Sequence, residues 1–329
     1  MITHPVDENR KLFLSFDQCH ILKNIRNQFL EREMTDGSGD ISGKYLKLLY
    51  KLQKDEIVKP VRNLTKKHIE PTAFEKMNVR RAKELFSPSV IAAISALKEN
   101  SLVHPQAYKF KDAEATLTFM TNINRWFIMH DISNTYHHIH GRNQDKMQFL
   151  SINDNRLEWL LDYFIPYLDT MKAAGNQLGK EFLTNETFEA LVLTTRSTVD
   201  CIKYLLQNGY HYILTRAFSS DPVESLFSTL RQMSGSNDMM DARSVSFSLQ
   251  KILKTGILSS SDFSNVEERT TSITEGPFQS LMPPDTATTE YTFPEQILII
   301  LEELLQEPRK LNQLTGIYKT CQLLLIIQV

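Results

Sequence analysis

Two carboxylate motifs, one near the start of the chain and one near its middle, constrain the fold most. Asp17 opens the first, Asp-Gln-Cys-His-Ile-Leu-Lys-Asn, directly after an apolar stretch. Asp221 and Glu224 lie in the second, Ser-Asp-Pro-Val-Glu-Ser-Leu-Phe, where a helix should begin. Active sites that bind divalent metals gather carboxylates from distant parts of a chain in this way. A fold that uses both motifs must therefore bring the two ends of a long intervening segment together.

The first motif stands between a predicted strand and a predicted helix. Residues 11–16 are aromatic and aliphatic enough for a largely buried strand. After Asp17, apolar side chains recur at helical spacing, and the helix is expected to end near Glu33. Asp17 is also a standard helix-start signal, so capping alone would explain it.

The second motif has the same two explanations. Asp221, Pro222 and Glu224 form a plausible capping box at the start of a helix. The spacing of three also places Asp221 and Glu224 on neighbouring positions of one helical face. Capping and metal binding both stay open at this point.

The segment between the motifs is predicted to be almost wholly helical. Glycines at 37, 39 and 43 indicate a loop, after which the pattern over residues 45–208 is almost wholly helical. Apolar side chains recur at three- and four-residue intervals over residues 79–97, 157–173 and 187–206. A helical bundle is the simplest packing, followed by a short strand at residues 210–214.

Three segments together resemble one known family. Residues 16–27, FDQCHILKNIRN, look like the strand-to-helix signature of the P-element family of DNA transposases. Residues 221–238, DPVESLFSTLRQMSGSND, are similar to that family's later motif, and residues 68–87 resemble the insertion between them. The resemblance covers roughly residues 1–257.

The resemblance implies an RNase H-like catalytic domain interrupted by a helical insertion that binds GTP. In that family, carboxylates hold two Mg²⁺ ions for phosphodiester cleavage and strand transfer. By motif, Asp17 is the second catalytic carboxylate and Glu224 the third, and both are metal ligands. Asp221 faces the nucleotide through its magnesium. The family's first aspartate lies further upstream than Asp7, so the chain resembles a carboxyl-terminal fragment that is inactive alone.

Nucleotide contacts are expected, by resemblance, at Lys76, Val79 and Phe127, with the Phe127 ring stacking on the base. The pattern departs from the family at Ile128, where an aspartate is usual and Asp131 lies further on. No glycine-rich phosphate loop of the Gly-x-x-x-x-Gly-Lys-Ser/Thr type occurs in the sequence. A core role for Phe127 is an equally good explanation.

A prediction of DNA binding has to rest on local basic patches, because the overall charge does not favour it. The net charge is −2, which supplies no global attraction to DNA. Contacts with DNA phosphates are expected at Lys23, Arg26 and Arg231, near the predicted metal site, although solvated helix faces have the same pattern. The histidines at 137, 138 and 140 lack a supporting ligand spacing and indicate a polar loop rather than a metal site.

The remaining signals concern location and the end of the chain. No signal peptide opens the sequence, and the apolar run at residues 323–327 is too short to span a bilayer. Three scattered cysteines suit a reducing compartment, so the nucleus or cytosol is expected. Residues 258–292 have the composition of a disordered linker, and residues 293–329 are expected to form a short helical tail.

The predicted fold class is α/β and mostly helical, a partial RNase H-like domain interrupted by an all-α insertion. Residues 1–36 and 209–257 form the split domain, and residues 37–208 form the insertion. Three functions remain: a transposase remnant with Mg²⁺ and GTP as cofactors and transposon-end DNA as partner, a non-enzymatic nucleotide- or DNA-binding protein, and a helical scaffold with capped helices. The second would form a homo-oligomer or a mixed assembly with a full-length transposase.

Overall fold

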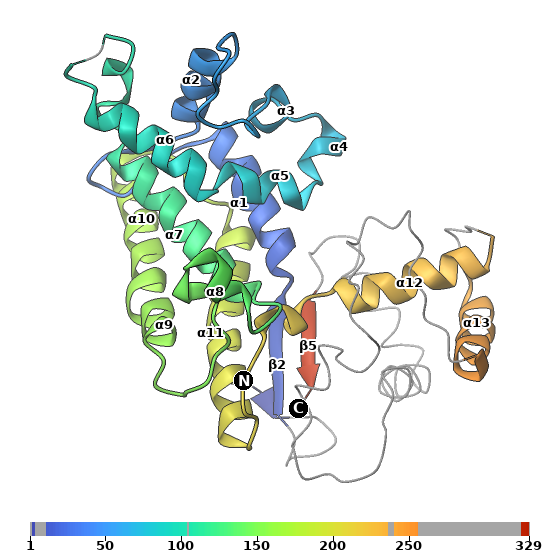
Figure 1. The fold of residues 1–329 in the computed structure, drawn as a ribbon. Helices are drawn as coiled ribbons and strands as arrows, with labels where there is room; N and C mark the ends of the chain where they lie inside the picture. Colours follow the sequence, from blue (N-terminus) through green and yellow to red (C-terminus); the bar gives the residue numbers. More distant parts are fainter. Residues whose placement is uncertain (1, 4–10, 104, 236–239, 256–323, 329) are drawn as a thin grey trace.

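A helical body lies against one side of a small sheet in the computed structural model, which describes residues 2–3, 11–103, 105–235, 240–255 and 324–328 (Figure 1). The central strand of the sheet is β2 (Lys11–Phe16), as predicted. It pairs antiparallel with β1 (Ile2–Thr3) on one side and β5 (Leu324–Gln328) on the other. Phe13 points into the core and is fully buried. The two ends of the chain therefore meet on this strand.

Two expectations about strands are wrong. Residues 324–328 are a strand, whereas the tail from residue 293 was expected to be helical; its remaining residues lie outside the described part. The predicted strand at residues 210–214 is reduced to one bridge between Ile213 and Phe149. The 3-10 turn η4 (Thr215–Phe218) follows immediately, which leaves no room for a longer ladder.

Helix α1 (Gln18–Glu31) continues directly from β2 and carries the core face that the sequence predicted. Its apolar side chains Ile21, Ile25 and Phe29 are fully buried. The helix ends at Glu31, earlier than expected, because β3 (Glu33–Thr35) turns back to pair with β4 (Asp40–Ser42). Gly37 has φ +88° in this hairpin, a conformation that glycine adopts without strain.

The first half of the insertion consists of short helices on one side of α1 (Figure 1). The expected single helix over residues 79–97 is two helices, because Pro88 begins a new one. The elements are α2 (Lys44–Gln53), α3 (Lys66–Ile69), α4 (Ala73–Lys76), α5 (Val79–Leu85), α6 (Pro88–Glu99) and η1 (Tyr108–Phe110).

The second half consists of longer helices, and α11 packs along β2. The Phe16 amide donates to Thr194 Oγ1 of this helix at 2.9 Å. The π-helical turn η3 precedes Pro166, which has no N–H to donate to the preceding turn. The elements are α7 (Glu114–His130), α8 (His137–Gly141), η2 (Gln144–Lys146), α9 (Asn155–Glu158), η3 (Trp159–Phe164), α10 (Ile165–Leu178) and α11 (Asn185–Gln207).

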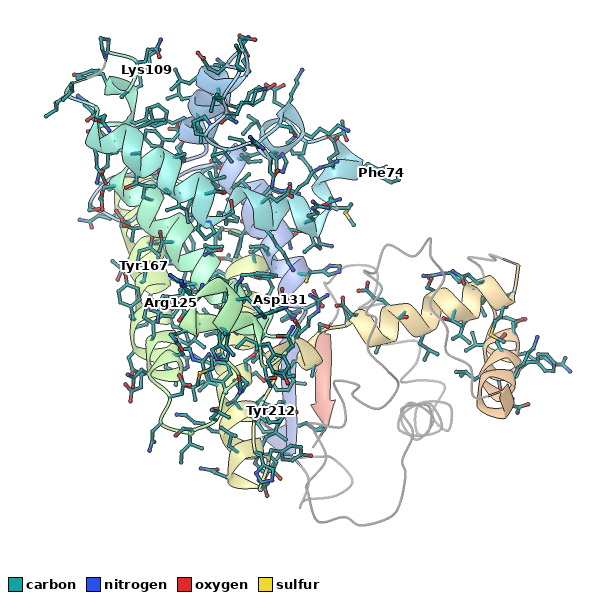
Figure 2. The ribbon with its side chains drawn as sticks, viewed as in Figure 1. Phe74, Lys109, Arg125, Asp131, Tyr167 and Tyr212 are labelled. Carbon is teal, nitrogen blue, oxygen red and sulfur yellow. The ribbon has the colours of Figure 1, made fainter. Side chains whose placement is uncertain are left out.

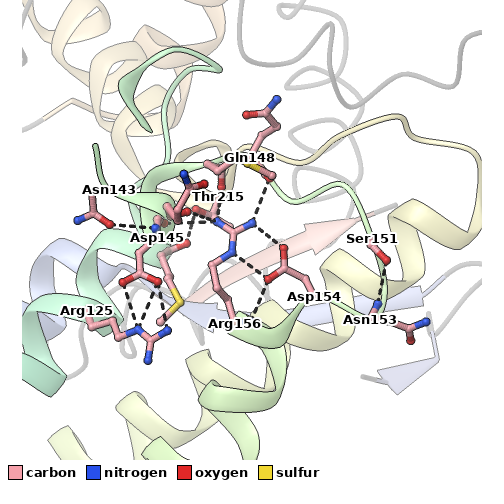
Figure 3. Close-up of polar contacts among 12 residues, drawn as sticks. Arg125, Asn143, Asp145, Gln148, Ser151, Asn153, Asp154, Arg156 and Thr215 are labelled. Carbon is pink, nitrogen blue, oxygen red and sulfur yellow. Dashed lines mark hydrogen bonds and ion pairs between the residues drawn. The ribbon is translucent and has the colours of Figure 1, made fainter. Parts of the chain in front are cut away.

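Arg156 fixes the long connection between α8 and α9 (Figure 3). Its buried guanidinium pairs with Asp154 at 2.6 Å and donates to the carbonyls of Met147 and Gln148. A buried cation is stable only when its donors are satisfied in this way. The connection, although irregular, is therefore held to the body.

Two helices, α12 (Asp221–Met233) and α13 (Ala242–Thr255), lead away from this body (Figure 1). They form their own small cluster of buried side chains from Leu226, Leu230 and Leu249. Within the described ranges, no helix is long and apolar enough to cross a membrane.

Candidate carboxylate junction and nucleotide site

Asp17 lies at the end of β2 and is the N-cap of α1. Its backbone is extended, and its Oδ1 accepts from the amides of Cys19 at 2.7 Å and His20 at 3.0 Å. The side chain is 1% exposed. The capping explanation of Asp17 is therefore confirmed.

The other oxygen of Asp17 reaches the start of α12, 203 positions along the chain. Its Oδ2 accepts from the Ser220 amide and from the Ser220 hydroxyl, each at 2.9 Å. A carboxylate has about four lone-pair sites. Three backbone N–H groups therefore occupy most of the carboxylate, and the single proton of the Ser220 hydroxyl is shared between Asp17 and Glu224.

Glu224 shares that hydroxyl. Its Oε1 lies 2.7 Å from Ser220 Oγ and 3.7 Å from His20 Nε2. The His20 contact, ahead of the Ser220 hydroxyl and the charge of Lys23, lowers the pKa of Glu224 to about 2. The structure thus brings Asp17 and Glu224 together, with one hydroxyl between them, which we call the carboxylate junction (Asp17, Ser220, Glu224).

The junction does not fit a magnesium ion as it is arranged. Mg²⁺ requires octahedral geometry and usually keeps several waters. Asp17 is enclosed by protein donors and has almost no surface from which a water-bearing ion could approach. Across the described part of the chain, no group of three or more histidine, cysteine, aspartate or glutamate side chains is arranged to hold a metal.

Asp221 differs from the capping box that its sequence suggests. It is the first residue of α12, whose N-cap is Ser220, and no side chain caps that helix. Its Oδ2 instead accepts from Arg216 Nη2 at 2.9 Å. Burial raises the pKa of Asp221 and outweighs the opposing effect of Arg216.

A line of alternating charges connects Asp221 to Phe127. Arg216 Nη1 donates to Asp131 Oδ1 at 3.0 Å, and Lys83 Nζ donates to Asp131 Oδ2 at 2.8 Å. The same Lys83 Nζ lies 4.8 Å from the centre of the Phe127 ring. We call these five side chains the charge relay; Asp131 lies at its centre, where the helical body meets the start of α12 (Figure 2).

Lys76 and Val79, the other two residues predicted to bind the nucleotide, lie on short helices next to α1. Lys76 ends α4 and pairs with Glu31 at 2.5 Å, and Val79 is the first residue of α5. Val79 and Lys83 are one turn apart on α5, which connects this group to the charge relay. Phe127 is 6% exposed, so it contributes to the core as well as to this line.

Arg26, one of the three residues predicted to contact DNA phosphates, is buried in the structure. It is 0% exposed, and its Nη2 donates to the carbonyls of Lys76 at 2.7 Å and Glu75 at 3.3 Å. Burial lowers its pKa. Arg26 thus holds the α4–α5 segment on α1 and cannot reach DNA. Lys23 is largely buried near Glu224, and Arg231 is exposed on α12.

Sequence reasoning missed Ser220 and Arg216, which make the decisive contacts. Ser220 directly precedes Asp-Pro, and a serine before a helix is itself a capping signal that could have been noticed. Arg216 carries no local signal. The histidine segment expected to be a polar loop forms the short helix α8.

Residues 19–144 match the family model "TNP-like, GTP-binding insertion domain". The Drosophila melanogaster "Transposable element P transposase" is 24% identical over 76% of this chain, and the human "DNA transposase THAP9" is 27% identical over 70% of it. The chain is a P-element-type transposase relative. It spans 31% and 25% of the length of those two proteins.

The fold agrees with this assignment. The chain in a solved structure titled "Drosophila P element transposase strand transfer complex" superposes with a TM-score of 0.55 and 20% identity, over 74% of this chain and 52% of that one. The predicted fold class, a mostly helical α/β chain with a partial RNase H-like domain and a helical insertion, is confirmed. The comparisons therefore relate this chain to transposases and relate residues 19–144 to a GTP-binding insertion domain.

Proposed function

We propose that this chain binds GTP and associates with DNA, and that it does not cleave DNA by itself. The observation that carries the last part of the proposal is the enclosure of Asp17, whose carboxylate accepts from three backbone amides and the Ser220 hydroxyl. The similarity of residues 19–144 to a GTP-binding insertion domain supports the first part. This carboxylate ties α1 to α12 and has no free site for a metal. The ancestral cleavage and strand transfer are therefore lost at this position, whereas the insertion domain keeps its nucleotide role.

The charge relay has side chains that fit a guanine nucleotide. Lys83 and Arg216 are cations suited to phosphates, and Phe127, whose ring Lys83 covers, would have to be uncovered to stack on a base. Bound GTP would supply a triphosphate for these cations. Lys76 and Val79, on the neighbouring segment, extend the proposed site, and Asp221 connects it to the helix that carries Glu224.

DNA enters the proposal from the relatives, one of which is solved as a strand transfer complex. Lys23 and Arg231 are the proposed phosphate contacts nearest the carboxylate junction. Assembly with a second copy, or with a full-length transposase, would let this chain act without its own cleavage chemistry.

A second candidate function is metal-dependent cleavage. The position of the Ser220 hydroxyl between Asp17 and Glu224 favours it, because two carboxylates converge on one point there. It would require Mg²⁺ to displace that hydroxyl and open the junction.

Calorimetric titration with GTP, and with ATP for comparison, tests the nucleotide site. We expect GTP to bind, and Lys83→Met to weaken it at least about tenfold, the loss of one charge-assisted phosphate contact. Lys172→Met is the matched control, since Lys172 Nζ also lies over a phenylalanine ring, Phe188, at 4.3 Å. Equal affinity of wild type and Lys83→Met, or no GTP binding by the wild type, would overturn the site.

A further inference from the structure

The helix α2 has a basic face that none of the sites above uses. Lys44, Lys47, Lys51 and Lys54 are exposed on one side of it. Tyr45, Leu46, Leu49 and Gln53 are buried on the other. Because lysines at these intervals fall on one helical face, they form a line about 15 Å long at 1.5 Å per residue.

Positive charge is far more concentrated in this segment than in the chain as a whole. Residues 44–67 contain eight lysines and arginines and two acids, although the whole chain has a net charge of −2. Among the residues that the structure describes, acidic partners are found for Lys54, Lys66 and Lys67 alone, which pair with Asp55, Glu70 and Glu75. Within the described residues, the other five cations of this segment form no ion pair; they are Lys44, Lys47, Lys51, Lys59 and Arg62. Unpaired like charges repel one another, so a polyanion would stabilise this surface.

Two aliphatic side chains extend the basic face beyond α2. Ile57 is 100% exposed and Val58 81% exposed, in the connection between α2 and α3. They stand between Lys54 and Lys59 in the sequence. Aliphatic side chains flanked by cations are found where proteins insert into a nucleic-acid groove or an anionic membrane.

We propose that this surface, α2 with the connection that follows it, binds the phosphate backbone of double-stranded DNA. A membrane contact would favour cations ringed around the apolar tip, whereas these lysines run in a line away from it along the helix. A line of cations complements a phosphate backbone, which carries one charge per about 1.7 Å of duplex. The surface lies at the far end of the helical body from α12, so it is separate from the carboxylate junction (Figure 1). The inference rests on the proposed association with DNA.

Fluorescence anisotropy with a labelled duplex of generic sequence, measured over a range of salt concentrations, tests the surface. The variant Lys44→Gln/Lys47→Gln/Lys51→Gln should lower the slope of log affinity against log salt by about 2 to 3, because each phosphate contact contributes about 0.9. At about 0.1 M salt its affinity should fall at least tenfold. Ile57→Ser/Val58→Ser should weaken binding and leave the slope unchanged.

The matched control is Arg196→Gln/Lys203→Gln/Arg243→Gln, which removes the same charge from α11 and α13. We expect it to keep the wild-type slope. If both triple variants behave alike, the surface is wrong while DNA association stands. If the wild type binds phosphatidylserine vesicles and no duplex, both the surface and the DNA association fail, and GTP binding is judged separately by calorimetry.

Discussion

The starts of α1 and α12 carry the same sequence signal, an aspartate before an apolar helix, and use it in different ways. Asp17 follows an extended strand, so its carboxylate can cap the new helix and still reach Ser220. Asp221 follows Ser220, whose backbone is already helical. Its carboxylate is therefore free to turn to Arg216. Asp17 caps its helix because it stands at the N-cap with an extended backbone, whereas Asp221 is already the first residue inside its helix.

The two aspartates also differ in what they hold together. Asp17 joins α1 to α12, which lie at the two ends of the insertion. Asp221 joins α12 to Arg216, and through it to Asp131 and Lys83 of the insertion. The first contact is buried, whereas the second is partly exposed.

The largest expected effect separates Asp17→Ala from Asp221→Ala. Asp17→Ala leaves several buried donors unpaired and should lower the free energy of unfolding by about 3–5 kcal/mol. Asp221→Ala removes a partly exposed ion pair and should cost about 1 kcal/mol or less. Urea denaturation followed by circular dichroism measures both. Similar losses in the two variants would remove the distinction.

Ser220→Ala and Ser219→Ala give the next largest contrast. The Ser220 hydroxyl contacts both carboxylates, and its loss should cost about 1.5–3 kcal/mol, the range for a hydrogen bond to a charged group. The Ser219 hydroxyl is also buried and has no partner among the described residues. Its removal should be neutral or slightly stabilising. A larger loss for Ser219→Ala, measured in the same urea series, would contradict the proposed junction.

Acidification should act on the two helix starts with opposite sign. The pKa of Glu224 falls from 4.5 to about 2 on folding, so its stabilisation is present above pH 4.5 and is lost as the pH approaches 2. The stability advantage of wild type over Glu224→Gln should shrink over that window. The pKa of Asp221 is raised above 3.8, so the cost of its buried charge disappears as the pH falls. The difference in stability between wild type and Asp221→Asn should shift in favour of the wild type, as urea denaturation at about pH 6 and about pH 3 measures.

The smallest expected effect is on the salt dependence of DNA binding, and it distinguishes an arginine of α12 from an arginine of α1. Arg231→Gln, on α12, should lower the salt slope of DNA binding by about 1, the loss of one phosphate contact. Arg26→Met, on α1, should reduce stability because Arg26 holds the carbonyls of Glu75 and Lys76, and it should leave the slope unchanged. A reduced slope for a folded Arg26→Met protein would show that this helix meets DNA after all.

Local patterns predicted much of the fold. The strand before Asp17, the helix after it and the long helix that became α11 follow from apolar spacing, which depends only on near neighbours. The start of a new helix at Pro88 could also have been predicted, because proline interrupts a helix and favours its first turn. The pairing of β5 with β2 joins residues from opposite ends of the chain, and no local pattern reports such a contact.

The candidate site was predictable in its members and not in its chemistry. The motifs identified Asp17, Asp221 and Glu224, and the structure brings all three to one place. The burial of Arg26 and the closure of Asp17 by Ser220 depend on tertiary packing. These two features limit which side chains are free to bind a ligand, and they support the proposal that Asp17 joins α1 to α12 instead of binding a metal.

The central claim, that Asp17 is a tie rather than a metal ligand, is tested most directly by nicking of supercoiled DNA in Mg²⁺ or Mn²⁺. The wild type would be compared with Asp17→Asn and Glu224→Gln, each checked for folding by circular dichroism. Our account predicts no nicking by any of the three proteins. Nicking by the wild type that disappears in both folded variants would contradict it and restore the carboxylate junction as a working metal site.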